Sequence, residues 1–205
     1  SWTGNLASGE IETVTFPDIT LTEGSHEFIA TITQTGDEDN TNNSLTRNFD
    51  VYDCGVSTLP FTEDFESGDL PSCWSYDGTL WTYQSGGHDG NPASAHTGSY
   101  NALFYHDDFT ADVSKLITPS FDFTGYSDAT LTFWHAQTVW AGDQDELRIY
   151  YKTSAGGAWQ LLSEYTSDIT AWTERTINLP NLSDDYYIAF EATGQYGYGV
   201  VLDDI

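Results

Sequence analysis

The chain has 205 residues, with 32 Asp and Glu against 5 Lys and Arg, and its formal net charge is −27. Nucleic acids and anionic membrane surfaces bind proteins through clustered Lys and Arg, so this charge excludes both as partners. A salt-adapted or secreted surface explains such an excess of acid, and so does a protein that binds divalent cations.

Short alternating segments indicate strands in the first quarter of the chain. Apolar and polar residues alternate over 11–16, 26–33 and 44–51, which is the pattern of a half-buried strand. The polar stretch 35–43 indicates a loop, because short polar side chains compete for backbone hydrogen bonds. Three strands in residues 1–53 are too few for a closed sandwich, so we expect part of an immunoglobulin-like domain.

Two cysteines, Cys54 and Cys73, follow this region. In a secreted domain a pair this close in sequence suggests one disulfide, whereas in a cytosolic protein both would be free thiols. We favour the disulfide, which would stabilise the fold by about 3 kcal/mol in the chain-entropy model. The sequence has no apolar run long enough to span a bilayer and no signal-peptide pattern at its start. We therefore expect a processed, secreted or cell-surface piece of a longer chain.

Strand patterns continue through the rest of the chain, and we find no sustained helical periodicity. Turn residues separate the strands, as in 154–157. The predicted strands are 102–105, 116–117, 129–135, 146–152, 159–165, 174–179, 186–191 and 199–205. About eight antiparallel strands in 150 residues predict an all-β chain whose larger part is a jelly-roll β-sandwich.

Two motifs in residues 54–205 resemble a known family. Residues 59–74 are LPFTEDFESGDLPSCW, and residues 197–205 are GYGVVLDDI. This paired opening and closing resembles the cleaved-adhesin family, the MAM-like jelly rolls of Bacteroidetes secreted proteins. The segments 98–103, 131–134 and 145–151 also fit the pattern of that family. The resemblance implies an extracellular, calcium-binding module that acts in adhesion or beside a catalytic domain.

The first region, residues 1–53, resembles the CARDB type of immunoglobulin-like adhesion domain. The matching segments are 21–28 and 37–43. The resemblance lacks the N-terminal strands of that family, so only part of such a domain is expected here.

Acidic residues in the two motifs predict a calcium site. Calcium takes six to eight oxygen ligands from carboxylates and carbonyls. The first and last strands of a jelly roll commonly lie side by side, which would bring Asp64 and Glu66 close to Asp203 and Asp204. The i, i+2 spacing puts Asp64 and Glu66 on one strand face, whereas Asp203 and Asp204 should point to opposite faces. The alternative is that all four are solvated charges at strand ends.

The resemblance adds Gly98 and Ser99 to this predicted calcium site, through a turn that supplies a carbonyl oxygen. No zinc signature is present: His88, His96 and His106 are spread over glycine- and serine-rich loops without the spacing of a metal motif.

The sequence also lacks the motifs of nucleophilic catalysis, so we expect no enzymatic activity from this chain.

Three aromatic residues are candidates for ligand binding. Trp140 precedes Ala-Gly-Asp, and Tyr196 and Tyr198 flank Gly197, so all three are predicted in loops. Sugar-binding modules use flat aromatic rings in such places, although ordinary packing would also explain them. Two functions remain open: a calcium-binding adhesion or accessory module, or a carbohydrate-binding module attached to a secreted hydrolase. The expected partners are an extracellular protein or glycan and other domains of the parent chain.

Overall fold

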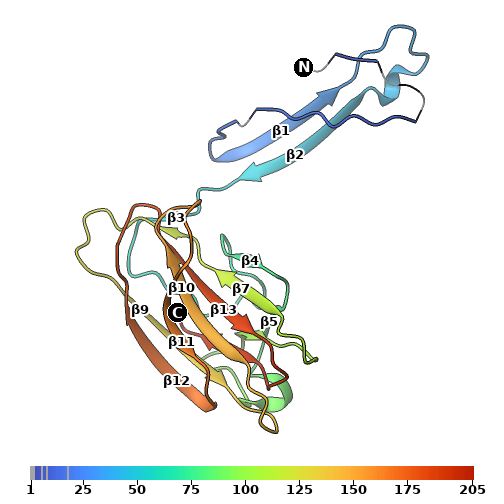
Figure 1. Ribbon diagram of the computed structural model, residues 1–205. Coiled ribbons are helices and arrows are strands. Elements are labelled where there is room, and N and C mark those ends of the chain that lie inside the picture. The colour runs from blue at the N-terminus through green and yellow to red at the C-terminus, as the bar shows by residue number, and fades with distance from the viewer. Residues whose placement is uncertain (1–2, 6, 8, 18) are drawn as a thin grey trace. The chain divides into compact units, whose positions relative to one another are not determined.

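The structure, a computed structural model, describes residues 3–5, 7, 9–17 and 19–205. The chain separates into two compact units, Ser1–Asp53 and Cys54–Ile205, and each is described by itself (Figure 1). Within the described residues, no helix has both the length and the apolar character needed to cross a membrane.

The first unit is built on one β-hairpin. Strand β1 (Gly24–Thr31) pairs antiparallel with β2 (Ser44–Val51). Their connection contains a short 3-10 helix, η1 (Asn40–Asn42), and the Asp39 side chain caps it by accepting a hydrogen bond from the Thr41 N–H. Both strands lie where the alternating patterns predict them.

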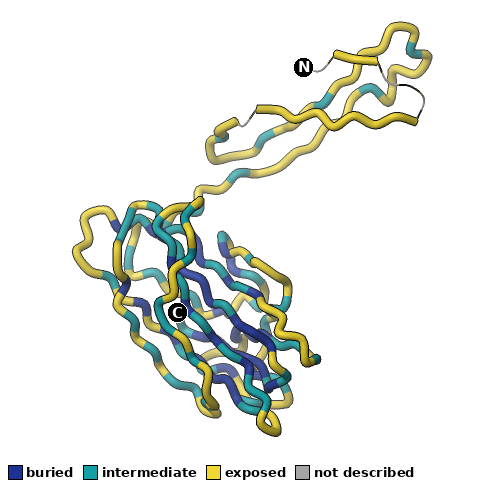
Figure 2. The backbone as a smooth tube through the Cα atoms, viewed as in Figure 1, coloured by how far each residue is buried: buried dark blue, intermediate teal, exposed yellow. Residues whose placement is uncertain are grey.

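The strand predicted at 11–16 is wrong. These residues belong to no strand, and Ile11 is 92% exposed. An alternating pattern makes a strand only where a neighbouring strand takes its backbone hydrogen bonds. No described residue of this unit is buried (Figure 2), so the hairpin lacks a core of its own. Its assignment to an immunoglobulin-like domain stays a prediction.

The second unit contains all the remaining strands. They are β3 (Gly55–Val56), β4 (Ser75–Asp77), β5 (Trp81–Gln84), β6 (Asn101–Phe104), β7 (Val113–Ile117), β8 (Ser120–Phe121), β9 (Thr130–Gln137), β10 (Glu146–Lys152), β11 (Gln160–Tyr165), β12 (Ile169–Asn178), β13 (Tyr187–Thr193) and β14 (Val200–Asp203). A second short 3-10 helix, η2 (His88–Gly90), lies between β5 and β6.

Ten of these strands form two antiparallel sheets. One sheet has the order β11–β10–β13–β7–β4, and the other has the order β12–β9–β14–β6–β5. Strands β3 and β8 form a small parallel pair. Neighbours in each sheet are mostly distant in sequence, which is the connectivity of a jelly roll rather than of a simple meander.

The core lies between the two sheets. In β10, Leu147, Ile149 and Tyr151 are buried while the residues between them are partly exposed. Phe133 of the other sheet and Phe190 of this one pack edge to face in the same cluster. Each large side chain buried in this way contributes about 1.5–3 kcal/mol. The all-β, jelly-roll prediction for residues 54–205 is confirmed.

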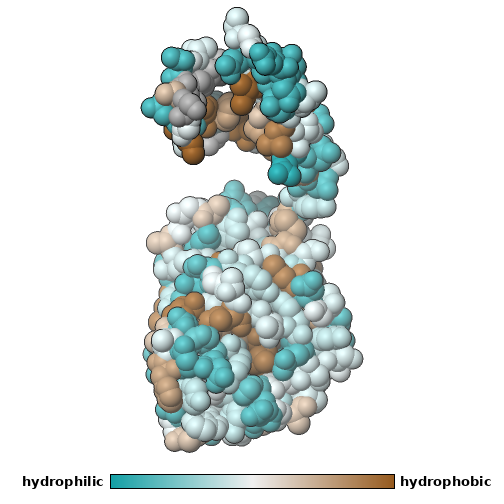
Figure 3. Space-filling view, turned by 90° about the vertical axis from the view of Figure 1, so that its right-hand side faces the viewer, coloured by the Kyte–Doolittle hydropathy of each residue, from teal (hydrophilic) through white to brown (hydrophobic). Residues whose placement is uncertain are grey.

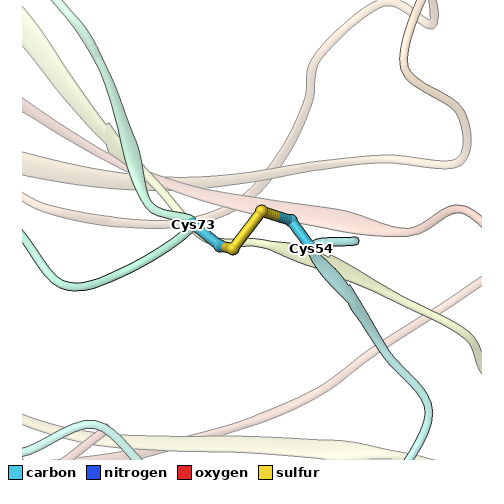
Figure 4. The surroundings of a disulfide bond; sticks show 2 residues. All are labelled: Cys54 and Cys73. Carbon is cyan, nitrogen blue, oxygen red and sulfur yellow. A yellow bond between two sulfur atoms is a disulfide. The ribbon is translucent and has the colours of Figure 1, made fainter. Parts of the chain in front are cut away.

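The surface of the second unit is mostly hydrophilic, with hydrophobic patches on the face shown in Figure 3. The predicted disulfide is confirmed: Cys54 and Cys73 are joined, and the described residues include no free cysteine (Figure 4). The bond ties the first residue of this unit to the segment that precedes the buried Trp74.

Candidate functional site

The start and the end of the second unit lie side by side. Glu63 and Ile205 exchange two backbone hydrogen bonds, each 2.9 Å long. This pairing places the segment 63–66 beside the C-terminal end of β14. The four acids predicted to bind calcium are called here the terminal acidic cluster; they are Asp64, Glu66, Asp203 and Asp204.

The local backbone of Asp64 and Glu66 differs from the prediction. They do not lie on a strand, because the buried Phe65 between them has a φ of 57° and turns the chain. The turn is held by side chains: Glu63 accepts a hydrogen bond from the Phe65 N–H at 2.8 Å, and Asp64 accepts one from the Glu66 N–H at 3.2 Å.

Glu66 binds the turn that contains Gly98 and Ser99. Its Oε1 accepts hydrogen bonds from the N–H groups of Ser99 at 2.7 Å and Tyr100 at 2.8 Å. Gly98 has a φ of 58°, and a Cβ added there would lie 2.3 Å from Glu66 Oε1. Only glycine therefore allows this close approach.

Asp203 and Asp204 both face the neighbouring loop. Asp203 Oδ2 accepts from the N–H groups of His96 at 2.9 Å and Thr97 at 3.2 Å. Asp204 accepts from the Thr97 hydroxyl at 2.7 Å and lies 2.5 Å from His96 Nδ1. The expectation that they point to opposite faces is wrong, because Asp204 has a φ of 48° and leaves the strand geometry.

Burial makes the charge on Asp203 costly. Its side chain is fully buried, and this burial raises the pKa of Asp203 to about 6, although hydrogen bonds from the backbone oppose the shift. Burial also raises the pKa of Glu63. A cation beside these groups would favour their ionised forms.

The structure brings all six predicted metal residues to one corner of the sandwich. However, the carboxylates of Glu66, Asp203 and Asp204 are spread around the loop 96–100 rather than focused on one point. Asp64 accepts from the Glu66 N–H instead. Within the described chain, the set of three His, Cys, Asp or Glu side chains whose ligand atoms lie within 4.8 Å of one another is His106, Asp108 and Asp112. Calcium at the terminal acidic cluster would therefore need backbone carbonyls or water as further ligands.

The three predicted ligand-binding aromatics line one pocket of about 190 Å³. Trp140 comes from the loop after β9, and Tyr196 and Tyr198 come from the loop between β13 and β14. Trp140 and Tyr196 meet edge to face, with ring centroids 5.1 Å apart. We call this the aromatic pocket; its lining residues are His88, Asp89, Tyr105, Asp107, Trp140, Tyr196, Gly197 and Tyr198.

A buried aspartate holds one wall of the aromatic pocket. Asp145 accepts hydrogen bonds from the N–H groups of Gln195 at 2.6 Å, Gly197 at 3.1 Å and Gly199 at 2.7 Å. A Cβ on Gly197 would lie 2.7 Å from an Asp145 carboxylate oxygen. The loop that carries Tyr196 and Tyr198 is thus fixed by its own backbone rather than by packing alone.

The rest of the pocket lining was not predicted from sequence. His88 of η2 stacks on Tyr105, with ring centroids 3.7 Å apart, and the Tyr105 hydroxyl donates to Asp107 at 3.3 Å. Burial and the nearby Asp107 raise the pKa of Tyr105 to about 12, so it is a neutral hydroxyl at physiological pH. None of the lining residues is Lys or Arg.

A larger pocket of about 690 Å³ lies beside the terminal acidic cluster, because Asp64 and Asp204 are among its lining residues. Phe61, Phe121, Phe123 and Tyr126 line it together with other apolar residues. It contains none of the predicted aromatics. Its lining residues come from five separate segments, so no local pattern in the sequence indicated this pocket.

Comparisons with known proteins agree with this architecture. The family model described as "MAM domain, meprin/A5/mu" matches residues 64–205. Among solved structures, the K1 and K3 cleaved adhesin domains of Lys-gingipain from Porphyromonas gingivalis are similar, each with a TM-score of 0.53 over 70% of this chain and 94% of theirs. Their sequence identities are 20% and 21%, which supports a shared fold. No curated protein matches the chain by sequence.

Proposed function

The chain belongs to the MAM domain family, and from that premise we propose that its second unit is a non-catalytic, extracellular accessory module that binds a glycan in the aromatic pocket. The observation that carries the proposal is the convergence of Trp140, Tyr196 and Tyr198, from two separate loops, on one pocket. A purely structural role would not require Trp140 to remain 40% exposed.

The chemistry of the aromatic pocket suits a sugar. Aromatic faces pack against the C–H groups of a pyranose ring, and the Tyr hydroxyls and carboxylates can bind its hydroxyl groups. The pocket is smaller than a typical site for a drug-sized ligand, which favours one sugar unit, such as a chain end. Because Asp89 and Asp107 line it without any Lys or Arg, the ligand is neutral or basic rather than a uronic or sulfated sugar.

Calcium at the terminal acidic cluster is the second part of the proposal. Both N–H groups that bind Glu66 use Oε1, so Oε2 keeps its lone pairs for a cation. The raised pKa of Asp203 means that an ionised cluster is costly without a counter-charge. The ion would stabilise the contact between the start and end of the unit. The disulfide supports an oxidising, extracellular compartment.

Glycan binding is tested with the full chain on an array of neutral, amino and acidic glycans, followed by calorimetry on the hits. Trp140→Ala should lower the affinity at least about tenfold, because the ring supplies most of the apolar contact. Trp159→Ala is the matched control: Trp159 lies outside the pocket, under the Lys152 ammonium group, and its loss should leave the affinity unchanged. An array without neutral or amino-sugar hits would refute the glycan assignment.

Calcium binding is tested separately by thermal unfolding in calcium and in EDTA. Saturation at a hundred times the dissociation constant should stabilise the folded state by about 2.7 kcal/mol. Gly98→Ala and Glu66→Gln should abolish this response. Gly125→Ala is the control, since Gly125 also has a positive φ but has no atom within 4 Å of an added Cβ. A midpoint that EDTA leaves unchanged would refute the calcium site and leave the glycan proposal standing.

A further inference from the structure

The loop between β6 and β7 gathers three side chains with metal-binding atoms. His106 Nδ1 lies 3.5 Å from Asp108 Oδ1 and 3.2 Å from Asp112 Oδ2. The Thr110 hydroxyl lies within hydrogen-bond distance of both Asp108 Oδ1 and Asp112 Oδ2 and donates its one proton to either of them, which keeps the two carboxylates close together. This set shares no residue with the terminal acidic cluster or with the lining of the aromatic pocket.

The spacing of the three atoms fits a small metal ion. Four ligands at the bond lengths of zinc, about 2.0 Å, lie about 3.3 Å apart at the corners of a tetrahedron. The two distances from His106 Nδ1, 3.5 and 3.2 Å, fall on either side of that value. Two carboxylates and one imidazole leave a fourth position for water, as in zinc sites with three protein ligands.

The environment of the His106 Nδ1 atom is a second observation that suits a metal ligand. Its Nδ1 atom is buried, yet it makes no hydrogen bond within the described structure. Its contacts with Asp108 and Asp112 are short but lack hydrogen-bond geometry. A protonated His106 that donates a hydrogen bond from Nδ1 to one of the two carboxylates therefore does not account for them. A buried nitrogen that makes no hydrogen bond and has only these two charged contacts is costly, and a metal ion between the three groups would satisfy Nδ1 and both carboxylates.

We propose that His106, Asp108 and Asp112 form a site for a divalent transition-metal ion such as Zn²⁺, distinct from the proposed calcium site. The imidazole decides the class of ion, because nitrogen ligands favour zinc and its neighbours whereas calcium and magnesium prefer oxygen alone. The proposal does not depend on glycan binding.

The site lies beside the aromatic pocket. Phe109, between the ligands, stacks on Tyr196 with ring centroids 4.2 Å apart. The Gly194 N–H donates to the Asp112 carbonyl at 2.9 Å, which joins the metal loop to the loop that carries Tyr196 and Tyr198. A bound ion would therefore fix two neighbouring loops at once.

The test is calorimetric titration of the EDTA-treated and dialysed full chain with ZnCl₂, in excess CaCl₂ so that calcium sites are filled. The parent should bind one equivalent of zinc at the loop. His106→Gln and Asp112→Asn should each lower the affinity at least about tenfold. Asp122→Asn is the matched control, because Asp122 makes the same turn with Thr124 as Asp108 makes with Thr110, and it belongs to no such cluster.

Cobalt supplies a second readout. Co²⁺ in place of zinc should give the intense visible absorption of a four-coordinate site in the parent and lose it in His106→Gln. Unfolding curves of the metal-free variants must match that of the parent, and Asp108→Asn replaces any variant that fails to fold. Absence of zinc binding, or an affinity that His106→Gln leaves unchanged, would overturn the proposal.

Discussion

Three aspartates accept a hydrogen bond from the backbone N–H of the threonine two residues later. They are Asp39 at 3.0 Å, Asp108 at 2.5 Å and Asp122 at 2.8 Å. Hydrogen bonds from the threonine hydroxyls, together with these backbone hydrogen bonds, hold the pKa of each carboxyl below its usual value. Local turns thus use carboxylates as backbone acceptors. In a chain with so few Lys and Arg, backbone N–H groups stabilise ionised carboxylates that cationic side chains stabilise in other proteins.

His135 illustrates the opposite case, a base buried without its charge. Burial, assisted by the nearby Arg175 guanidinium, lowers the pKa of His135 to about 3, and the Arg175 Nε donates to its Nδ1 at 3.3 Å. The unfolded chain binds a proton here near pH 6.5 but the folded chain does not. Stability from this group is therefore fully present above pH 6.5 and falls as the pH drops toward 3.

We predict that His135→Gln makes the free energy of unfolding less dependent on pH below pH 6.5. Between pH 7.5 and 5 the parent should lose about 2 kcal/mol more free energy of unfolding than the variant, measured by urea denaturation. Gln can still accept the hydrogen bond from Arg175. His26→Gln, in the first unit, is the matched control and should leave the pH profile of the second unit unchanged. Parallel profiles for the parent and His135→Gln would show that His135 titrates normally.

Among the elements, most strands of the second unit were predictable from sequence, including the four-residue β6 and β14. The ten-residue β12 was expected only over 174–179, and β4 and β5 were missed. Strand β10 (Glu146–Lys152) has the bounds that its alternation predicts. Strands β4 and β5 have only three and four residues, too few to establish a period of two. The segment 11–16 fails for the converse reason: it has the pattern but no strand to pair with, and a single sequence does not reveal partners.

The candidate sites were also predictable only in part. Motif and topology were enough to bring the terminal acids and the turn at Gly98 together. They did not reveal the positive φ values of Phe65 and Asp204, which set where the carboxylates point. Such values depend on tertiary contacts in residue types that rarely adopt them. The histidine of the metal loop was visible in the sequence, but Asp112 lies six residues away without a recognised spacing.

The loop between β13 and β14 depends on one acidic anchor, and this yields a prediction for Asp145→Asn. Asp145 Oδ1 accepts two N–H groups and Oδ2 accepts the third, whereas Asn has one acceptor oxygen and an NH₂ group. At least one buried N–H then loses its partner, at a cost of about 1–3 kcal/mol. We expect glycan affinity to fall at least about tenfold, measured by calorimetry, while circular dichroism stays that of a folded sandwich.

Asp168→Asn is the control for this loop. Asp168 accepts one N–H, from Val139 at 3.1 Å, and the Asn oxygen can replace it. The control should therefore keep both its stability and its affinity. Equal effects of the two substitutions would mean that lost charge, rather than the lost acceptor, controls the pocket.

At the scale of the whole molecule, the formal charge of −27 on 205 residues means that folding concentrates negative charge. Compact structure brings like charges closer, so self-repulsion opposes folding. Salt shortens the reach of that repulsion, from about 30 Å at 0.01 M to about 3 Å at 1 M. The backbone hydrogen bonds to Asp145, Asp203 and Glu66 are local and hardly change with salt.

We therefore predict that NaCl stabilises the second unit. Raising it from 0.01 to 0.5 M at pH 7.5, in EDTA, should raise the Tm by several degrees, since about 1 kcal/mol shifts the Tm of a chain this size by 2–4 °C. Tryptophan fluorescence follows this unit, because six of the seven Trp residues lie after Cys54. Choline chloride should act like NaCl, because screening does not depend on the cation. Near the sequence pI of about 4.1, where the net charge vanishes, the effect of salt on the Tm should disappear. An equal rise in Tm at pH 7.5 and at the pI would mean that the salt acts through the hydrophobic effect. Charge repulsion would then not limit the stability of this fold.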